Sequence, residues 1–154
     1  MIRTKGRLRL CTALLICCLA FIWGNSLLPA NMSGQISGAL KAFLDGLFSP
    51  GGGSPSASGD GLLRKFAHFA EFGALGFLLG WLFGMLGKKW PVPFLLGVAA
   101  ACVDETIQIF VPGRGPGIRD VCIDSCGVAA GMLLLVFGHA CLREESTRKN
   151  FRRK

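Results

Sequence analysis

Four apolar runs dominate the chain and limit the folds that it can adopt. They cover about residues 10–28, 64–86, 90–111 and 120–142. Each is close to the roughly 20 residues that an α-helix needs to cross the hydrocarbon core of a bilayer. Hydrophobic residues make up 51% of the 154 residues, and the mean hydropathy of +0.51 exceeds that of an ordinary soluble domain. We therefore expect an all-α fold, an integral membrane four-helix bundle made by a single domain over residues 1–154.

The segments between and beyond these runs have other patterns. A basic start before the first run also fits a cleavable signal peptide, but the run is long for a signal and has no clear small-x-small cleavage site, so we expect an uncleaved anchor. Residues 49–61 have the Gly, Ser and Pro content of a flexible linker, and the basic tail 143–154 is expected to be frayed. A short interfacial amphipathic helix is predicted between runs one and two, because one helical face collects Ile36, Leu40, Phe43, Leu44, Leu47 and Phe48.

Two sets of glycines spaced four residues apart predict close helix packing. They are Gly127 with Gly131, and the series Gly76, Gly80 and Gly84. Small residues at this spacing let helix backbones approach each other where hydrophobicity offers no driving force between helices. The seven cysteines are odd in number and lie mainly in apolar runs, so we expect no disulfide framework.

The basic residues indicate topology. The net charge of +8 would suit a nucleic acid, but the basic residues flank apolar runs and do not form one basic face, so no nucleic-acid partner is expected. With four spans, the N-terminal segment, the Lys88-Lys89 turn and the tail share one side and hold most of the 17 basic residues. The positive-inside rule places that side, and both termini, in the cytoplasm.

Charged and amide side chains within the last three runs constrain function. An ionisable group at membrane depth costs roughly 2.5–3.5 kcal/mol even on insertion scales, so these groups must face protein, water or a ligand. At a rise of about 1.5 Å per residue, Glu71, Asp104 and Asp124 lie about 8–12 Å below the same, outer ends of their helices. Helical spacing turns them toward one outward-opening polar pocket, for which we predict Lys65, His68, Glu71, Asp104, Glu105, Gln108, Arg114, Asp120 and Asp124.

The chemistry of this pocket has several interpretations. Guanidinium and ammonium groups suit phosphate or carboxylate, and the anion-binding candidates are Arg64, Lys65, Arg114 and Arg119. His68 with Glu71 or Asp104 would move a proton if a reaction occurs, but no catalytic residue is assigned and enzyme activity is left open. A histidine among carboxylates suits Mg²⁺, Mn²⁺ or Zn²⁺, yet the spacing matches no dedicated metal motif, so no metal ligands are assigned. Ion pairs that only lock the helices together are the structural alternative.

Two motifs resemble those of a known family. The stretches RKFAHFAEFGALGF (64–77) and DETIQIFVPGRGPGIRDVCIDSCG (104–127) resemble the VanZ-like family, small bacterial multi-pass membrane proteins named after a teicoplanin-resistance protein. Where this family commonly has asparagine, the chain has Asp124. The resemblance implies a multi-pass protein of the bacterial cytoplasmic membrane, in a family whose founding member lowers glycopeptide susceptibility. Family polar positions correspond to Lys65, His68, Glu71, Asp104, Glu105, Gln108, Pro112, Arg114, Asp120 and Gly127.

Three functions are compatible with these features. The leading hypothesis is an outward pocket that binds or modifies an anionic component of the cell envelope, such as a lipid-linked phosphate or a cell-wall precursor. A proton-coupled transporter or channel component would use the acids as a relay. A structural partner of another envelope protein would use them only to hold helices together. In each case the lipid bilayer is the surrounding medium, and the oligomeric state is left open.

Overall fold

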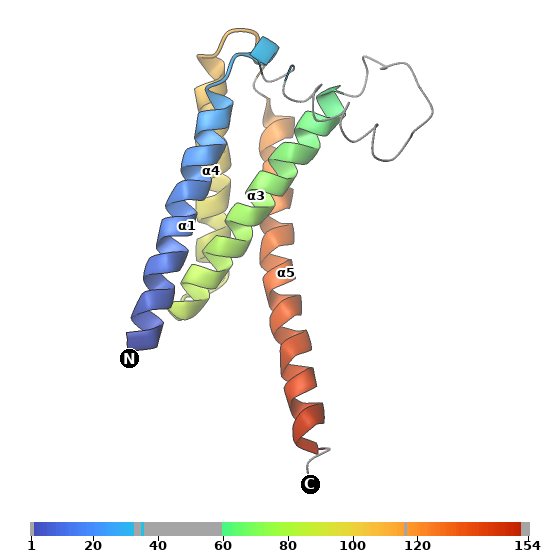
Figure 1. Cartoon of the computed structure of the whole chain (residues 1–154). Helices are drawn as coiled ribbons and strands as arrows, with labels where there is room; N and C mark the ends of the chain where they lie inside the picture. The colour runs from blue at the N-terminus through green and yellow to red at the C-terminus, as the bar shows by residue number, and fades with distance from the viewer. Residues whose placement is uncertain (1, 33–34, 36–59, 116, 152–154) are drawn as a thin grey trace.

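The computed structural model describes residues 2–32, 35, 60–115 and 117–151. Within this part of the chain the regular structure is helical, and no strand is present. The helices are α1 (Ile2–Ser26), α3 (Asp60–Met85), α4 (Pro91–Ile109) and α5 (Ile118–Phe151) (Figure 1). The expected interfacial helix and almost all of the expected linker lie outside the described residues.

All four helices are long and apolar enough to cross a membrane. The qualifying segments are Lys5–Ser26, Leu63–Met85, Pro91–Ile109 and Ile118–Glu145. A helix satisfies its own backbone hydrogen bonds, which is a condition for spanning lipid. The expected all-α architecture with four such helices is therefore confirmed.

Helix boundaries differ from the expected ones at three places. The first helix begins at Ile2, so the basic N-terminal residues form its first turns, and α3 begins at Asp60, within the expected linker. The largest difference is at the C-terminus, where α5 continues to Phe151. The expectation of a frayed tail is wrong for residues 143–151, because no glycine or proline follows Gly138 to end the helix.

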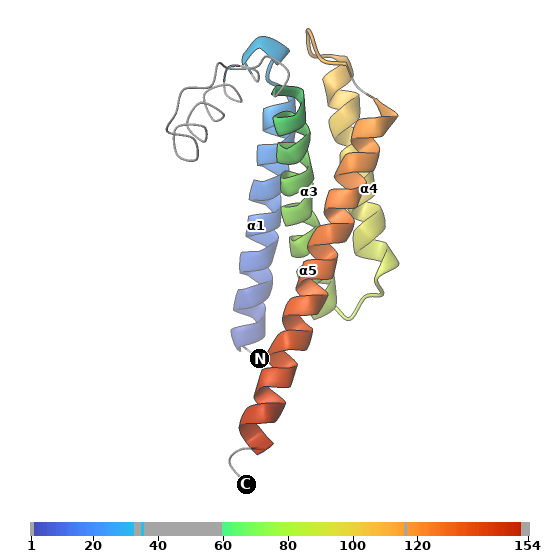
Figure 2. The ribbon, with the colours of Figure 1, turned by 90° about the vertical axis from the view of Figure 1, so that its right-hand side faces the viewer.

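The helices run alternately up and down, which groups their ends. Both termini and the α3–α4 turn lie at one end of the bundle, and the C-terminal turns of α5 extend beyond the other helices (Figures 1 and 2). The opposite end collects the C-terminal ends of α1 and α4 and the N-terminal ends of α3 and α5. Polar residues near those four ends are thus brought to one level.

Glycines bring α3 and α5 into direct backbone contact. A Cβ added at Gly131 would meet the backbone of Gly73 and Phe77, and one added at Gly127 would meet the Phe69 carbonyl oxygen. A Cβ added at Gly76 would meet the backbone of Val128. The expected role of Gly76, Gly127 and Gly131 is therefore confirmed.

One glycine of the expected series does not take part in packing. Gly84 is exposed, and a Cβ there would meet nothing within 4 Å. Gly73, which the four-residue spacing did not single out, takes its place in the interface with α5. The α3 and α5 axes diverge toward the end of the bundle at which Gly84 lies, as Figure 1 shows.

The core beneath the grouped polar ends is apolar. It consists of Ile22, Phe72, Leu75, Leu79, Ala100, Ala101, Val128 and Met132. Large apolar side chains such as Phe66, Leu134 and Phe137 are exposed on the outside of the helices, as expected for a surface that faces lipid. All seven cysteines are free.

Candidate functional site

Polar side chains from all four helices meet at the end of the bundle described above. Each helix contributes residues from its last or first turns at that end, because the apolar runs begin or end there. The contributors are Asn25 and Ser26 from α1, Arg64, Lys65, His68 and Glu71 from α3, Asp104, Glu105 and Gln108 from α4, and Asp120 and Asp124 from α5.

The centre of this group is a histidine between two aspartates. His68 Nδ1 lies 3.8 Å from Asp104 Oδ2 and 3.7 Å from Asp124 Oδ1, so three helices supply one residue each. Both aspartates are 0% exposed and His68 is 8% exposed. Each of the three residues has one nitrogen or oxygen atom that could bind a metal, and these three atoms lie within 4.8 Å of one another. This is the one arrangement in the described residues that could hold a metal ion.

Several atoms of this centre have no hydrogen-bond partner. They are His68 Nδ1, Asp104 Oδ1 and both carboxylate oxygens of Asp124. Within the described residues, neither aspartate forms an ion pair with a lysine or an arginine. Because an unpaired buried charge is costly, simple locking of helices by ion pairs does not account for these groups.

Gln108 links the centre to α1 and to the cationic residues. Its Nε2 donates to Asp104 Oδ2 at 2.9 Å and to Ser26 Oγ at 3.3 Å. Its Oε1 accepts a hydrogen bond from Arg64 Nη2 at 3.1 Å. The amide therefore holds Asp104 in one orientation and ties Arg64 to the site.

Two residues of the site were missed in the sequence. Asn25 Nδ2 donates to Glu71 Oε1 at 3.1 Å, and Ser26 is 1% exposed beside Gln108. The available signal was an adjacent pair of polar residues near the end of an otherwise apolar run. Neither residue is ionisable, so the charge that distinguishes the other pocket residues does not distinguish these two.

Glu105 has a structural contact and a free oxygen. Its Oε2 accepts a hydrogen bond from the Gly117 N–H at 2.9 Å, just before α5 begins. Its Oε1 is buried without a partner. Glu105 thus positions the start of α5 while it faces the cavity described below.

Arg114 holds the α4–α5 connection against the end of α1. Its Nε donates to the Leu28 carbonyl and its Nη2 to the Asn25 carbonyl, both at 3.1 Å. Burial lowers the pKa of the Arg114 guanidinium from its ordinary value, and the charge of Arg64 lowers it further. These contacts give Arg114 a structural role, and it does not line the cavity described next.

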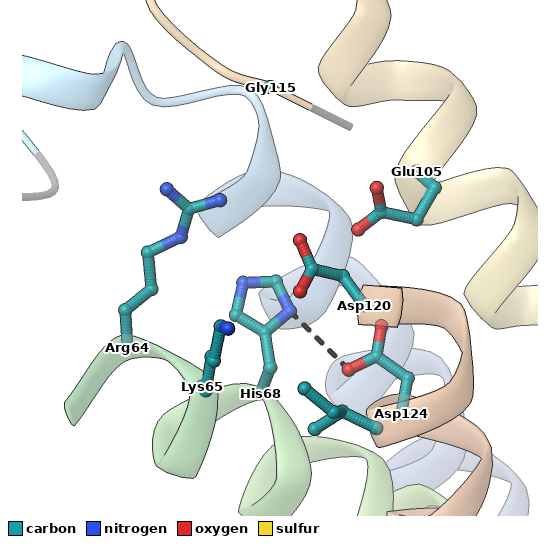
Figure 3. Close-up of a pocket in the computed structure, with 8 residues that line it drawn as sticks. Arg64, Lys65, His68, Glu105, Gly115, Asp120 and Asp124 are labelled. Atoms are coloured by element: carbon teal, nitrogen blue, oxygen red, sulfur yellow. Dashed lines mark ion pairs between the residues drawn. The ribbon is translucent and has the colours of Figure 1, made fainter. Parts of the chain in front are cut away.

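A cavity of about 160 Å³ opens beside the central histidine. Figure 3 shows Arg64, Lys65 and His68 on α3 facing the carboxylates of α4 and α5 across it. Arg64 is half-buried and Lys65 is exposed, and neither forms an ion pair with an acid among the described residues. The exposed Arg119 does not line the cavity. The lining residues are Arg64, Lys65, His68, Glu105, Gly115, Asp120, Ile123 and Asp124.

The helices and the polar cavity have the arrangement of a membrane protein. Four helices of membrane-spanning length, with a polar cavity between their ends on one side of the bundle, make this a small multi-pass membrane protein. Within that class the chain belongs to the VanZ-like family, because the family model described as VanZ/LLP1 matches residues 11–139. The resemblance noted in the sequence is therefore confirmed. No curated protein and no solved structure matched the chain.

Proposed function

We propose that this VanZ-like protein lies in the bacterial cytoplasmic membrane with both termini in the cytoplasm. Its polar cavity then opens on the outer side and binds the phosphate of an anionic lipid or of a lipid-linked cell-wall precursor. The observation that carries the proposal is that Arg64 and Lys65 line the cavity, yet neither is paired with an acid among the described residues. Arginine binds phosphate through forked hydrogen bonds, and lysine does so as a point charge.

The size of the cavity is compatible with a phosphate group. Its volume of about 160 Å³ is well above that of one water molecule. Because the cavity is open on one side, the rest of a headgroup can extend out of it toward water. Binding of a cell-wall precursor in this way would link the protein to glycopeptide susceptibility.

The proton-coupled alternative has less support. The side chains directly beyond the acidic cluster are apolar and buried, among them Phe72, Leu75, Val128 and Met132. A proton relay across the membrane would need polar groups or water at that level.

Lipid binding to the detergent-purified protein tests the proposal. Native mass spectrometry would compare phosphatidic acid with diacylglycerol, which lacks the phosphate. We expect the wild type to retain phosphatidic acid selectively, and Arg64→Gln combined with Lys65→Gln to weaken binding at least about tenfold, since a charge-assisted hydrogen bond is worth about 1.5–3 kcal/mol.

Arg119→Gln is the matched control, because Arg119 is a nearby exposed cation outside the cavity lining. It should bind like the wild type. Equal retention of both lipids by the wild type, or unchanged phosphatidic acid binding in the double variant, would refute the assignment.

A further inference from the structure

We infer that His68, Asp104 and Asp124 form a binding site for one divalent cation, Mn²⁺ or Zn²⁺. The three residues come from α3, α4 and α5, and their ligand atoms lie within 4.8 Å of one another. This inference does not depend on the proposed lipid function, because it rests on the unpartnered atoms of these three residues and is tested with the metal alone.

The charge of the cluster calls for a cation. When ionised, the two fully buried carboxylates carry a charge of −2 beside a neutral imidazole, and one divalent ion cancels that charge. The unpartnered atoms, namely Nδ1 of His68, Oδ1 of Asp104 and both oxygens of Asp124, are all of the ligand type. A divalent ion would satisfy the charge and the free lone pairs together.

A protonated histidine is a weaker explanation of the same cluster. It supplies a single positive charge, which leaves one carboxylate uncompensated in the interior. The distances of 3.7 and 3.8 Å from Nδ1 to the carboxylate oxygens also exceed the range of about 2.7–3.2 Å for a hydrogen bond. Both carboxylates would then still hold unsatisfied oxygens.

The spacing of the three residues is close to that of a metal site. Ligand atoms placed tetrahedrally at about 2.0–2.2 Å from an ion are about 3.3–3.6 Å apart. The distances from His68 Nδ1, 3.8 Å to Asp104 Oδ2 and 3.7 Å to Asp124 Oδ1, exceed this by a few tenths of an ångström, and one ligand atom from each of the three residues lies within 4.8 Å of the other two.

A hydrogen bond from Gln108 already orients Asp104, one of the three candidate metal ligands. Gln108 donates to Asp104 Oδ2 and is itself held by Ser26 and Arg64, while Asp104 Oδ1 has no partner. Metal-binding carboxylates typically have such hydrogen-bonded neighbours. Because His68 and Asp124 also line the cavity shown in Figure 3, a bound ion would keep a coordination position open toward it.

The ligand types select the metal. Imidazole suits Zn²⁺, whereas carboxylates suit Mn²⁺ and Mg²⁺. Calcium requires six to eight oxygen ligands and magnesium keeps several waters, so one nitrogen with two carboxylates favours Mn²⁺ or Zn²⁺.

Metal binding to the purified protein tests this site. The full chain is prepared in detergent without a polyhistidine tag, stripped with chelator and titrated with Mn²⁺, followed by electron paramagnetic resonance, and with Zn²⁺ against a competing chelator. We expect one equivalent per chain, and at least about 100-fold weaker binding in His68→Gln and in Asp124→Asn. Gln108→Ala should weaken binding about 10–100-fold, as is typical of a supporting residue.

His139→Gln is the matched control, since His139 is the second histidine of the chain and is exposed on α5. It should bind metal like the wild type. Absence of a saturable equivalent in the wild type would overturn the inference, as would unchanged affinity in folded His68→Gln or Asp124→Asn. If these two variants fail to fold, the metal affinity of Gln108→Ala is measured instead. The thermal midpoint of the wild type is measured as well, and it must rise with Mn²⁺ or Zn²⁺ concentration.

Discussion

Replacement of Gly131 by alanine should separate the two helices that carry most of the site. A Cβ at this position would lie 2.7 Å from the Gly73 carbonyl carbon and 2.8 Å from the Phe77 nitrogen, and closer still to the Gly73 carbonyl oxygen. Ordinary van der Waals contact begins at 3.4 Å. The atoms that it meets belong to the backbone of α3, so no side-chain rotation can relieve the overlap.

The size of the effect follows from two opposing contributions. Overpacking of a tight interface costs about 1–3 kcal/mol, with backbone contacts at the upper end, and the better helix propensity of alanine offsets about 1 kcal/mol. We therefore expect Gly131→Ala to lower the free energy of unfolding by about 2 kcal/mol. Gly84→Ala gains the same propensity with no contact within 4 Å, and should raise it by about 0.5–1 kcal/mol.

Equilibrium unfolding in mixed micelles, with increasing dodecyl sulfate and circular dichroism as the signal, measures both variants under one set of conditions. The difference between them should be about 3 kcal/mol. The proposed packing of α3 on α5 is incorrect if Gly131→Ala is as stable as the wild type or as Gly84→Ala.

Two further predictions concern single contacts, and a third concerns the membrane topology. Arg114→Ala should lower the free energy of unfolding by about 1–3 kcal/mol, because two charge-assisted hydrogen bonds to the end of α1 are lost, while the exposed Arg119→Ala should stay within about 0.5 kcal/mol of the wild type in the same assay. Glu105→Ala should cost about 1–2 kcal/mol and speed hydrogen exchange at the Gly117 amide, and a variant with unchanged exchange there would contradict the contact. A fluorescent protein fused to the C-terminus should fold and fluoresce, whereas an alkaline phosphatase fusion at the same point should be inactive; the reverse pattern would place the cavity on the cytoplasmic side.

Much of the fold could be predicted because lipid restricts the backbone to few solutions. Apolar runs of about 20 residues can cross a bilayer only as helices or within a closed barrel, and their length favours helices. The ends of the helices were less predictable. The charged segment after Leu142 contains no helix stop, so α5 continues where a polar tail was expected to fray.

The depth of the candidate site along the helices could be predicted from the sequence, but the contacts between its side chains could not. A fixed rise per residue put Glu71, Asp104 and Asp124 at one depth, and the structure brings the two aspartates together around His68. Arg114 illustrates the limit. Its position in a Gly/Pro turn suggested an anion site, whereas it donates to the carbonyls of Asn25 in α1 and of Leu28 just after α1, almost 90 residues earlier in the chain.

Three properties could be predicted from local sequence: the four helices of membrane-spanning length, the common depth of Glu71, Asp104 and Asp124, and the VanZ-like motifs. They depend on local composition and on the constant rise of a helix. Which helix faces meet became evident in the folded bundle, where Gly73 rather than Gly84 contacts α5 and His68 lies between Asp104 and Asp124. The rotation of each helix about its axis is set by packing against distant segments, and no local pattern contains that information.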